Sequence, residues 1–322
     1  MSRFNLPLVG IVLAVFAASC NTDLDYDAMK AEENRYFKIY MDANYPDSVP
    51  RSSGLYYFNY KEGSGQMADT GDYILINYLA YTIPDEEVVD TYTEEWAVDY
   101  GLYSSGVLYG PYKYKHGTEI EGMKEGISLM KEGGIARLIF KSDLGYGSTE
   151  FGSIDMFESL MYDIELVKVI GDAEEADAYE KQQMADYLAT IEDGYVTEIY
   201  DSATNATMYY ILETVGDSIP LRDELAAEVY YTGKLLDGRV FDTNAESSSG
   251  FDVTVGAGDV ISGWDIGLKY FRYGGKGKLL IPHELAYGAD GILDNTTNKT
   301  SIPPYEALLF DIEVTKTVVE TE

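Results

Sequence analysis

The stretch GWDIGLKYFRYGGKGKLLIPHELAYG, residues 263–288, decides the fold because the chain contains a second version of it. GMKEGISLMKEGGIARLIFKSDLGYG, residues 122–147, shares glycines and a tyrosine with it at the same spacing. The matched pairs include Gly122 and Gly263, Gly126 and Gly267, Gly133 and Gly274, Tyr146 and Tyr287, and Gly147 and Gly288. The segments that follow, SIDMFESLMYDIELVKV (153–169) and SIPPYEALLFDIEVTKT (301–317), also run in step. This repeat predicts two copies of one domain.

Local patterns around the repeat indicate its elements. Apolar residues alternate with polar ones in 160–166, 251–255 and 308–314, as in half-buried strands. Between the strands of the second copy, apolar residues recur at helical spacing after Asp259, which we expect to be the N-cap; they are Val260, Ile261, Trp264 and Leu268. We therefore predict an α+β fold with one short helix against an antiparallel sheet in each copy.

Glycines in the predicted helix need an explanation, because each costs about 1 kcal/mol relative to alanine in a helix interior. Close packing of the helix on the sheet would require Gly263 and Gly267. Longer helical stretches precede both copies, at 25–43 and 174–192. Their apolar faces favour packing against the domains over a role as free linkers.

These patterns predict the boundaries of five segments. They are a signal peptide (1–19), an acidic leader and helix (20–52), a first domain (53–170), a helical linker (171–206) and a second domain (207–322).

The composition excludes several classes of function. Asp and Glu number 56 against 23 Lys and Arg, and the net charge of −33 argues against nucleic-acid binding, which depends on cations. With His116, His283 and Cys20 as the only imidazoles and thiol, we expect no Cys/His zinc site, no metal and no cofactor. The apolar fraction of 46% predicts a globular core.

The N-terminus is typical of a secretory signal. Residues 1–20 carry Arg3, an apolar run over 6–18 and small residues before Cys20. The last four residues resemble a bacterial lipobox, which implies that Cys20 becomes a lipidated N-terminus. We expect an exported protein that is lipid-anchored in the bacterial outer membrane, on its periplasmic or cell-surface face. The alternative is an ordinary secretory signal with an incidental cysteine.

Acidic residues follow directly, in 21–27. They resemble the surface-export signals of some Gram-negative lipoproteins, and a solvated leader is an equal alternative.

Four motifs in the second copy carry a family resemblance. They are YYTGKLLDGRVFDT (230–243), VGAGDVISGWDIGL (255–268), LLIPHELAYG (279–288) and IPPYEALLFDIEV (302–314). In this order and spacing they resemble the FKBP-type peptidyl-prolyl cis-trans isomerases over about residues 207–318. The resemblance implies a curved antiparallel sheet wrapped on one short helix in each copy, in agreement with the local patterns.

The resemblance also implies an aromatic pocket for proline. Its catalytic residues would be Tyr231, Phe241, Asp242, Trp264, Tyr287 and Phe310, and its substrate-binding residues Phe251, Val260, Ile261 and Ile302. Trp264 would form the floor, and the Tyr287 hydroxyl would bond a substrate carbonyl. Rotation about an X-Pro bond meets a barrier of about 18–20 kcal/mol. A dry apolar pocket that binds a twisted amide better than a planar one lowers this barrier without an obligatory acid or base.

The first copy departs from this pattern. Val89, Met123 and the pair Asp155-Met156 stand in place of the wall phenylalanine, the floor tryptophan and the Pro-Pro pair. The retained positions are Tyr78, Asp90, Ile120, Tyr146, Ile154 and Tyr162. We therefore interpret 53–170 as a divergent FKBP-like domain with a binding or structural role.

Three further departures lie near the two pockets. The first copy has a Tyr-rich insertion between Asp90 and Met123, which contains Tyr100, Tyr103 and Tyr109. In the second copy, segment 288–301 is longer and more polar than is usual in the family, and 243–250 lacks the basic residue that many members pair with the aspartate.

The leading hypothesis is thus a peptidyl-prolyl isomerase, with catalysis mainly in the second domain, that assists folding of exported proline-containing clients. The alternative is a non-catalytic FKBP-like chaperone, or a peptide-binding or adhesion lipoprotein. A third hypothesis is glycan capture by tyrosines of 100–114. The sequence leaves the oligomeric state open.

Overall fold

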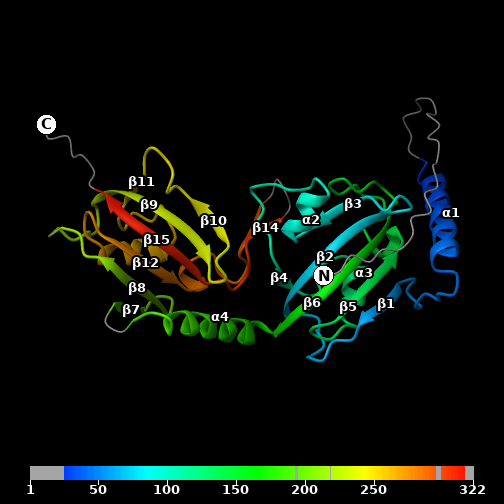
Figure 1. Ribbon diagram of the computed structural model, residues 1–322, viewed down its shortest axis with the longest axis horizontal. Coiled ribbons are helices and arrows are strands. Elements are labelled where there is room, and N and C mark those ends of the chain that lie inside the picture. Colours follow the sequence, from blue (N-terminus) through cyan, green and yellow to red (C-terminus); the bar gives the residue numbers. More distant parts are fainter. Residues whose placement is uncertain (1–24, 193–194, 218, 295–298, 316–322) are drawn as a thin grey trace.

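The structure is a computed structural model that describes residues 25–192, 195–217, 219–294 and 299–315. Two antiparallel sheets lie at opposite ends of the molecule, and helix α4 (Ala173–Leu188), which connects them along the chain, lies beside the second sheet (Figure 1). The predicted α+β fold with two repeated domains is therefore confirmed. The signal peptide and Cys20 lie outside the described residues.

The first sheet has the strand order β1-β5-β6-β2-β3, and β4 pairs with β2. Its strands are β1 (Tyr56–Lys61), β2 (Tyr73–Ile83), β3 (Val88–Thr91), β4 (Tyr112–Lys115), β5 (Ile135–Phe140) and β6 (Ser159–Gly171). The helices of this part are α1 (Tyr26–Asn44), α2 (Glu94–Asp99), α3 (Glu121–Ile127) and the 3₁₀ helix η1 (Ser142–Leu144).

The second sheet has the order β10-β9-β15-β12-β8-β7, and β11 pairs with β9. Its strands are β7 (Val196–Asp201), β8 (Ala206–Thr214), β9 (Ala226–Leu235), β10 (Val240–Thr243), β11 (Phe251–Thr254), β12 (Lys276–Ile281) and β15 (Leu308–Thr315). The helices are α5 (Ser262–Gly267), η2 (Leu268–Tyr270) and η3 (His283–Leu285), and β13 (Ile292–Asp294) pairs with β14 (Lys299–Ile302) in a separate ribbon.

The two sheets have the same topology, with β1, β5, β6, β2, β3 and β4 matching β8, β12, β15, β9, β10 and β11. Strand β7 has no counterpart in this match and pairs with β8 at the sheet edge. The range 171–206, predicted as a helical linker, thus contains a strand of the second sheet as well as α4.

The short helices lie tightly on their sheets. An added Cβ at Gly126 would stand 2.3 Å from Leu138, and one at Gly263 would stand 2.4 Å from Ile281. A Cβ at Gly267 would likewise stand 2.6 Å from Leu279, so close packing explains these glycines, as predicted for Gly263 and Gly267. Asp259 is not the N-cap of α5, because the helix begins after Ile261; the Asp265 carboxylate instead accepts the N–H groups of Gly256 and Gly258.

The helices that precede the domains pack on the outer faces of the sheets. Phe37 and Met41 of α1 share an apolar cluster with Ile139 and Met161. Met184 of α4 likewise clusters with Leu280 and Leu309, which occupy the matching positions of the second sheet. None of the helices in the described residues is long and apolar enough to cross a membrane.

The two domains contact each other through side chains that are largely buried. The Lys113 ammonium lies 2.8 Å from the Glu306 carboxylate and donates to the Tyr305 carbonyl. Leu108 of the Tyr-rich insertion belongs to the second domain's apolar core, and the neighbouring Tyr109 carbonyl accepts from Arg239.

Candidate proline-binding site

Five aromatic rings of the second domain gather at one place between sheet and helix. The Trp264 ring lies edge-on to Tyr231 at 5.1 Å and to Phe310 at 5.2 Å between centroids. Phe241 meets Phe310 at 5.5 Å, and Phe251 meets Trp264 at 6.2 Å. Edge-to-face packing of this kind is favourable for aromatic rings. The structure thus brings together Tyr231, Phe241, Phe251, Trp264 and Phe310.

The floor of the site is buried, whereas other residues of the site are partly exposed to solvent. Trp264 and Phe310 are each only 4% exposed, whereas Phe251 is 43% and Tyr287 37% exposed. Ile302 is buried in the same core, and Val260 and Ile261 pack against it half-buried. The predicted substrate-binding residues therefore surround a buried aromatic floor, and their roles in binding remain predictions.

Asp242 is held by a tyrosine. The Tyr231 hydroxyl donates to the Asp242 carboxylate at 2.6 Å. Burial, reinforced by this carboxylate, raises the pKa of Tyr231 well above its usual range. Tyr231 therefore fixes Asp242 where the sequence offers no basic partner in 243–250.

Tyr287 presents its hydroxyl near the rim. Burial raises its pKa above the ordinary value of 10.0, and the charge of Asp242 adds to the rise. The phenol is consequently protonated at neutral pH and can donate a hydrogen bond to a carbonyl.

Gly233 is a site residue that the sequence reasoning missed. A Cβ at this position would lie 2.5 Å from the Phe241 ring and 2.9 Å from the Phe310 ring. Only glycine leaves room for both rings. The strand register places Gly233 opposite Asp242 and Phe310, and that register is not visible in the sequence alone.

Trp264 also carries an unpaired donor. Its indole N–H is buried and has no hydrogen-bond partner among the described residues. A buried donor without an acceptor costs about 1–3 kcal/mol, which an acceptor on a bound peptide would recover.

The first domain builds a related cluster from different residues. The Tyr78 hydroxyl donates to Asp90 at 2.5 Å, as Tyr231 does to Asp242. Tyr162 lies 5.9 Å from Tyr78, in the position of Phe310, while Met123 and Val89 occupy the floor and wall. Tyr146 packs half-buried against the same core, together with Ile120, and Ile154 is buried within it.

Tyr112 is the first domain's counterpart of Phe251, another residue that the sequence reasoning missed. It pairs with Ile76 on β2, as Phe251 pairs with Val229 on β9. It stacks on Tyr92 at 4.4 Å and on Tyr114 at 4.7 Å. The insertion before β4 changes the sequence spacing and hides this match.

A residue of the second domain covers the rim of this first site. The Lys299 ammonium lies 2.6 Å from Asp90, donates to the Thr91 carbonyl and stands 4.6 Å from the Tyr92 ring centroid. The Thr300 N–H donates to the Tyr92 hydroxyl. Segment 288–301, singled out for its length, thus reaches the neighbouring domain with its described end.

One cluster in the described part of the chain brings together donors that a metal ion could use: Asp177, Glu180, His283 and Glu284. Contacts within the protein account for three of the four residues without an ion, and Glu284 Oε2, which is buried without a hydrogen bond among the described residues, lies 3.3 Å from His283 Nδ1. Glu180 accepts both the backbone N–H and Nδ1 of His283, and Asp177 pairs with Lys181. We therefore assign no metal to this cluster.

Comparison with known proteins identifies the family. The model of the FKBP-type peptidyl-prolyl cis-trans isomerase family matches residues 65–167 and 219–315, together more than half of the chain. The chain therefore belongs to the FKBP-type peptidyl-prolyl cis-trans isomerases and carries two domains of this family in tandem.

Individual relatives match parts of the chain. It is 40% identical over 111 residues to the FKBP-type peptidyl-prolyl cis-trans isomerase FkpA of Buchnera aphidicola, across 34% of this chain and 42% of that protein. It is 42% identical over 88 residues to the FK506-binding protein of Neisseria meningitidis serogroup C, across 27% of this chain and 75% of that protein. The crystal structure of FkpA from Escherichia coli is 29% identical with a TM-score of 0.36, across 44% of this chain and 61% of that one. The chain thus spans less than half the length of the Buchnera relative.

Proposed function

We propose that this protein catalyses cis-trans isomerisation of X-Pro bonds and that the second domain carries the activity. The observation that carries the proposal is the ring cluster around the buried Trp264, with Phe251 and Tyr287 partly exposed to solvent. A prolyl ring is apolar and compact, and it fits a floor made of edge-packed aromatic rings. Membership of the isomerase family supports the same reaction.

The geometry suits a reaction that needs little acid or base chemistry. The apolar walls exclude water from the imide carbonyl, which disfavours the charge-separated resonance form and weakens the double-bond character of C–N. The protonated Tyr287 hydroxyl can hold a neighbouring substrate carbonyl while the bond twists. Tighter binding of the twisted amide than of either planar isomer then lowers the barrier.

The contrast between the domains supports the choice of the second one. Its mouth residues are exposed, whereas the rim of the first site is bonded to Lys299 and its floor is Met123. A structural or accessory binding role suits the first domain better than turnover.

The test is exchange NMR on an X-Pro peptide with the full chain. We expect the wild type to accelerate exchange, and Tyr287→Phe to lower kcat/KM by about threefold to tenfold through loss of one hydrogen bond. A folded wild type that leaves the exchange rate at its value in buffer would contradict the proposal.

We further propose that the clients are exported polypeptides and that a lipid on Cys20 anchors the protein in the outer membrane. The proposal is supported by the signal-like sequence of 1–20. Expressed with its leader in a bacterium, the wild type should incorporate labelled fatty acid and sediment with membranes. Cys20→Ser should do neither; equal labelling of both proteins would exclude Cys20 as the anchor.

A further inference from the structure

Each domain receives one buried carboxylate from the helix that precedes it. Glu33 on α1 is 7% exposed and Glu180 on α4 is fully buried. Both helices lie outside the ranges that match the family model, 65–167 and 219–315. The same arrangement, a buried carboxylate on the preceding helix, thus occurs in both halves of the repeat.

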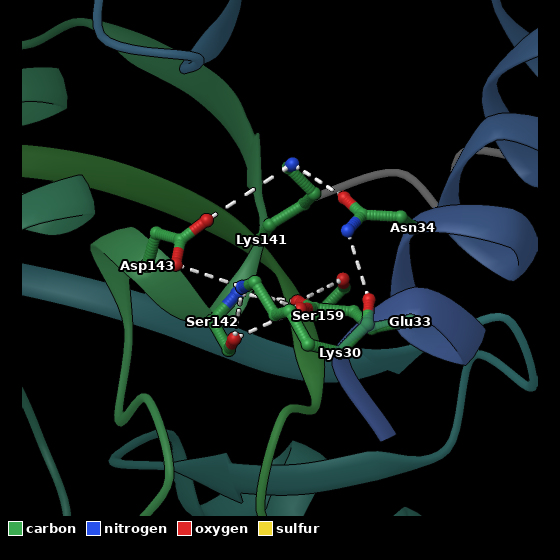
Figure 2. A network of polar contacts seen from close by, with 7 residues as sticks. All are labelled: Lys30, Glu33, Asn34, Lys141, Ser142, Asp143 and Ser159. Atoms are coloured by element: carbon green, nitrogen blue, oxygen red, sulfur yellow. Dashed lines mark hydrogen bonds and ion pairs between the residues drawn. The ribbon is translucent and has the colours of Figure 1, made fainter. Parts of the chain in front are cut away.

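Glu33 binds the start of η1 in the first domain, as Figure 2 shows. One carboxylate oxygen accepts the Ser142 backbone N–H at 2.6 Å and the Ser159 hydroxyl at 2.9 Å. The other accepts the Ser142 hydroxyl at 2.9 Å and pairs with Lys30 at 2.7 Å. The carboxylate is thereby fully bonded inside the protein.

Glu180 makes the corresponding contacts in the second domain. It accepts the His283 backbone N–H at 2.8 Å and the His283 Nδ1 at 2.5 Å. His283 opens η3 as Ser142 opens η1, so the same backbone group is bound in both domains. The side-chain donor differs, hydroxyl in one and imidazole in the other, while the carboxylate is retained.

His283 and Ser142 also hold the turns that carry Tyr287 and Tyr146. The His283 carbonyl accepts the N–H groups of Ala286 and Gly288, on either side of Tyr287. The Ser142 carbonyl accepts those of Gly145 and Gly147, which enclose Tyr146. A path of direct contacts therefore runs from Glu180 through His283 to the backbone that places the Tyr287 hydroxyl.

We propose that Glu180 is a positioning residue of the isomerase site, which acts through His283 to fix the Tyr287 hydroxyl, and that α4 is part of the functional unit. This inference rests on the proposed function of the second domain.

The test is a double-mutant cycle in the full chain. Glu180→Ala should lower kcat/KM for an X-Pro peptide about as much as removing the Tyr287 hydroxyl, threefold to tenfold. In a Tyr287→Phe background the same change should cost less than about twofold, because both act on one interaction. Glu180→Gln, which keeps an acceptor for the His283 N–H, should retain more activity than Glu180→Ala.

Two matched controls separate positioning from general destabilisation. Lys181→Ala removes the exposed neighbour on the same helix and should leave the rate unchanged. Glu33→Gln alters the equivalent carboxylate of the first domain and should perturb Tyr146 without changing turnover. Circular dichroism establishes that each variant is folded. If Glu180→Ala unfolds, Glu180→Gln replaces it in the double-mutant cycle with Tyr287→Phe.

A second readout does not depend on turnover. In a chain with ¹³C-labelled tyrosine, the ring signal absent from Tyr287→Phe identifies Tyr287, and Glu180→Gln should shift it while Lys181→Ala should not. Additive losses in the cycle, or an unmoved Tyr287 signal, would overturn the inference. A wild type without turnover would instead refute the proposed function, and the ring signal would still decide the role of Glu180.

Discussion

The two domains share a strand topology and differ in how they use it. At one position of the central strands the second domain has Gly233 and the first has Ala80, paired with Asp242 and Asp90 respectively. The missing Cβ makes room for the Phe241 ring, and in the first domain Val89 stands in place of that ring. The wall, the floor and the glycine beneath them all differ between the two domains. The aromatic pocket therefore depends on all three positions together.

The largest effect is expected from breaking the buried pair that joins the domains. Lys113→Ala leaves the Glu306 carboxylate buried without its cation, and burial already raises the pKa of Glu306. We expect a loss of about 3–5 kcal/mol in the free energy of unfolding measured in urea. Lys113→Met with Glu306→Gln, which removes both charges, should lose clearly less; equal losses would show that the charge pair does not couple the domains.

Replacing Gly233 by alanine, the residue at this position in the first domain, tests whether the aromatic rings require a glycine. Gly233→Ala should cost about 1–3 kcal/mol of stability through overpacking against Phe241 and Phe310, and lower turnover. Adding Phe241→Val gives the alanine and valine pair that the first domain has at these positions. This double variant should regain stability without regaining turnover. A Gly233→Ala protein as stable and active as the wild type would mean that the glycine is not required by the rings.

His283, which stands where the first domain has Ser142, predicts a pH effect on stability. Burial opposes the charge on His283, yet its bonds to Glu180, with Glu284 and Asp177 nearby, hold its pKa above 6.5. A pKa raised by folding gives stability that is complete below about pH 6.5 and is lost as the pH rises through the raised value. The thermal midpoint of the wild type should therefore fall more between about pH 6 and pH 9 than that of His283→Ser. Parallel midpoints in the two proteins would rule out this contribution.

The smallest effect should come from uncovering the first site. Lys299→Ala removes the cation on Asp90, and we expect peptide affinity at the first domain to rise by tenfold or less. The affinity is measured in a Trp264→Leu background, so that peptide binding by the second domain does not contribute to the signal. Lys276→Ala, which loses an exposed ion pair with Glu313, serves as control. Unchanged affinity in Lys299→Ala would show that Lys299 does not limit access.

The sequence predicted the parts that depend on short-range pattern. Alternation and repeat spacing gave the two sheets with their short helices, and the motif resemblance gave the ring set around Trp264. The predicted cap at Asp259 was wrong because α5 begins at Ser262, so that Ile261 occupies the N-cap position.

What the sequence could not supply depends on contacts between distant segments. Lys299 on Asp90 and Lys113 on Glu306 exist only once the domains are docked. Glu180 looks like one acid among 56, and only packing shows that it is buried. Tyr112 was hidden by the insertion before its strand, although the register of β4 on β2 reveals it.

The most direct test of the difference between the domains is X-Pro exchange NMR on two full-length variants, Trp264→Leu and Met123→Leu. Both replace the floor of one pocket by the same residue. If the second domain carries the activity, Trp264→Leu should lower the catalysed exchange rate by about 10²-fold, which is equivalent to about 2.7 kcal/mol of barrier. Met123→Leu should leave the rate within about twofold of the wild-type value. Equal losses in the two folded variants, or a loss in Met123→Leu alone, would contradict the assignment of catalysis to the second domain.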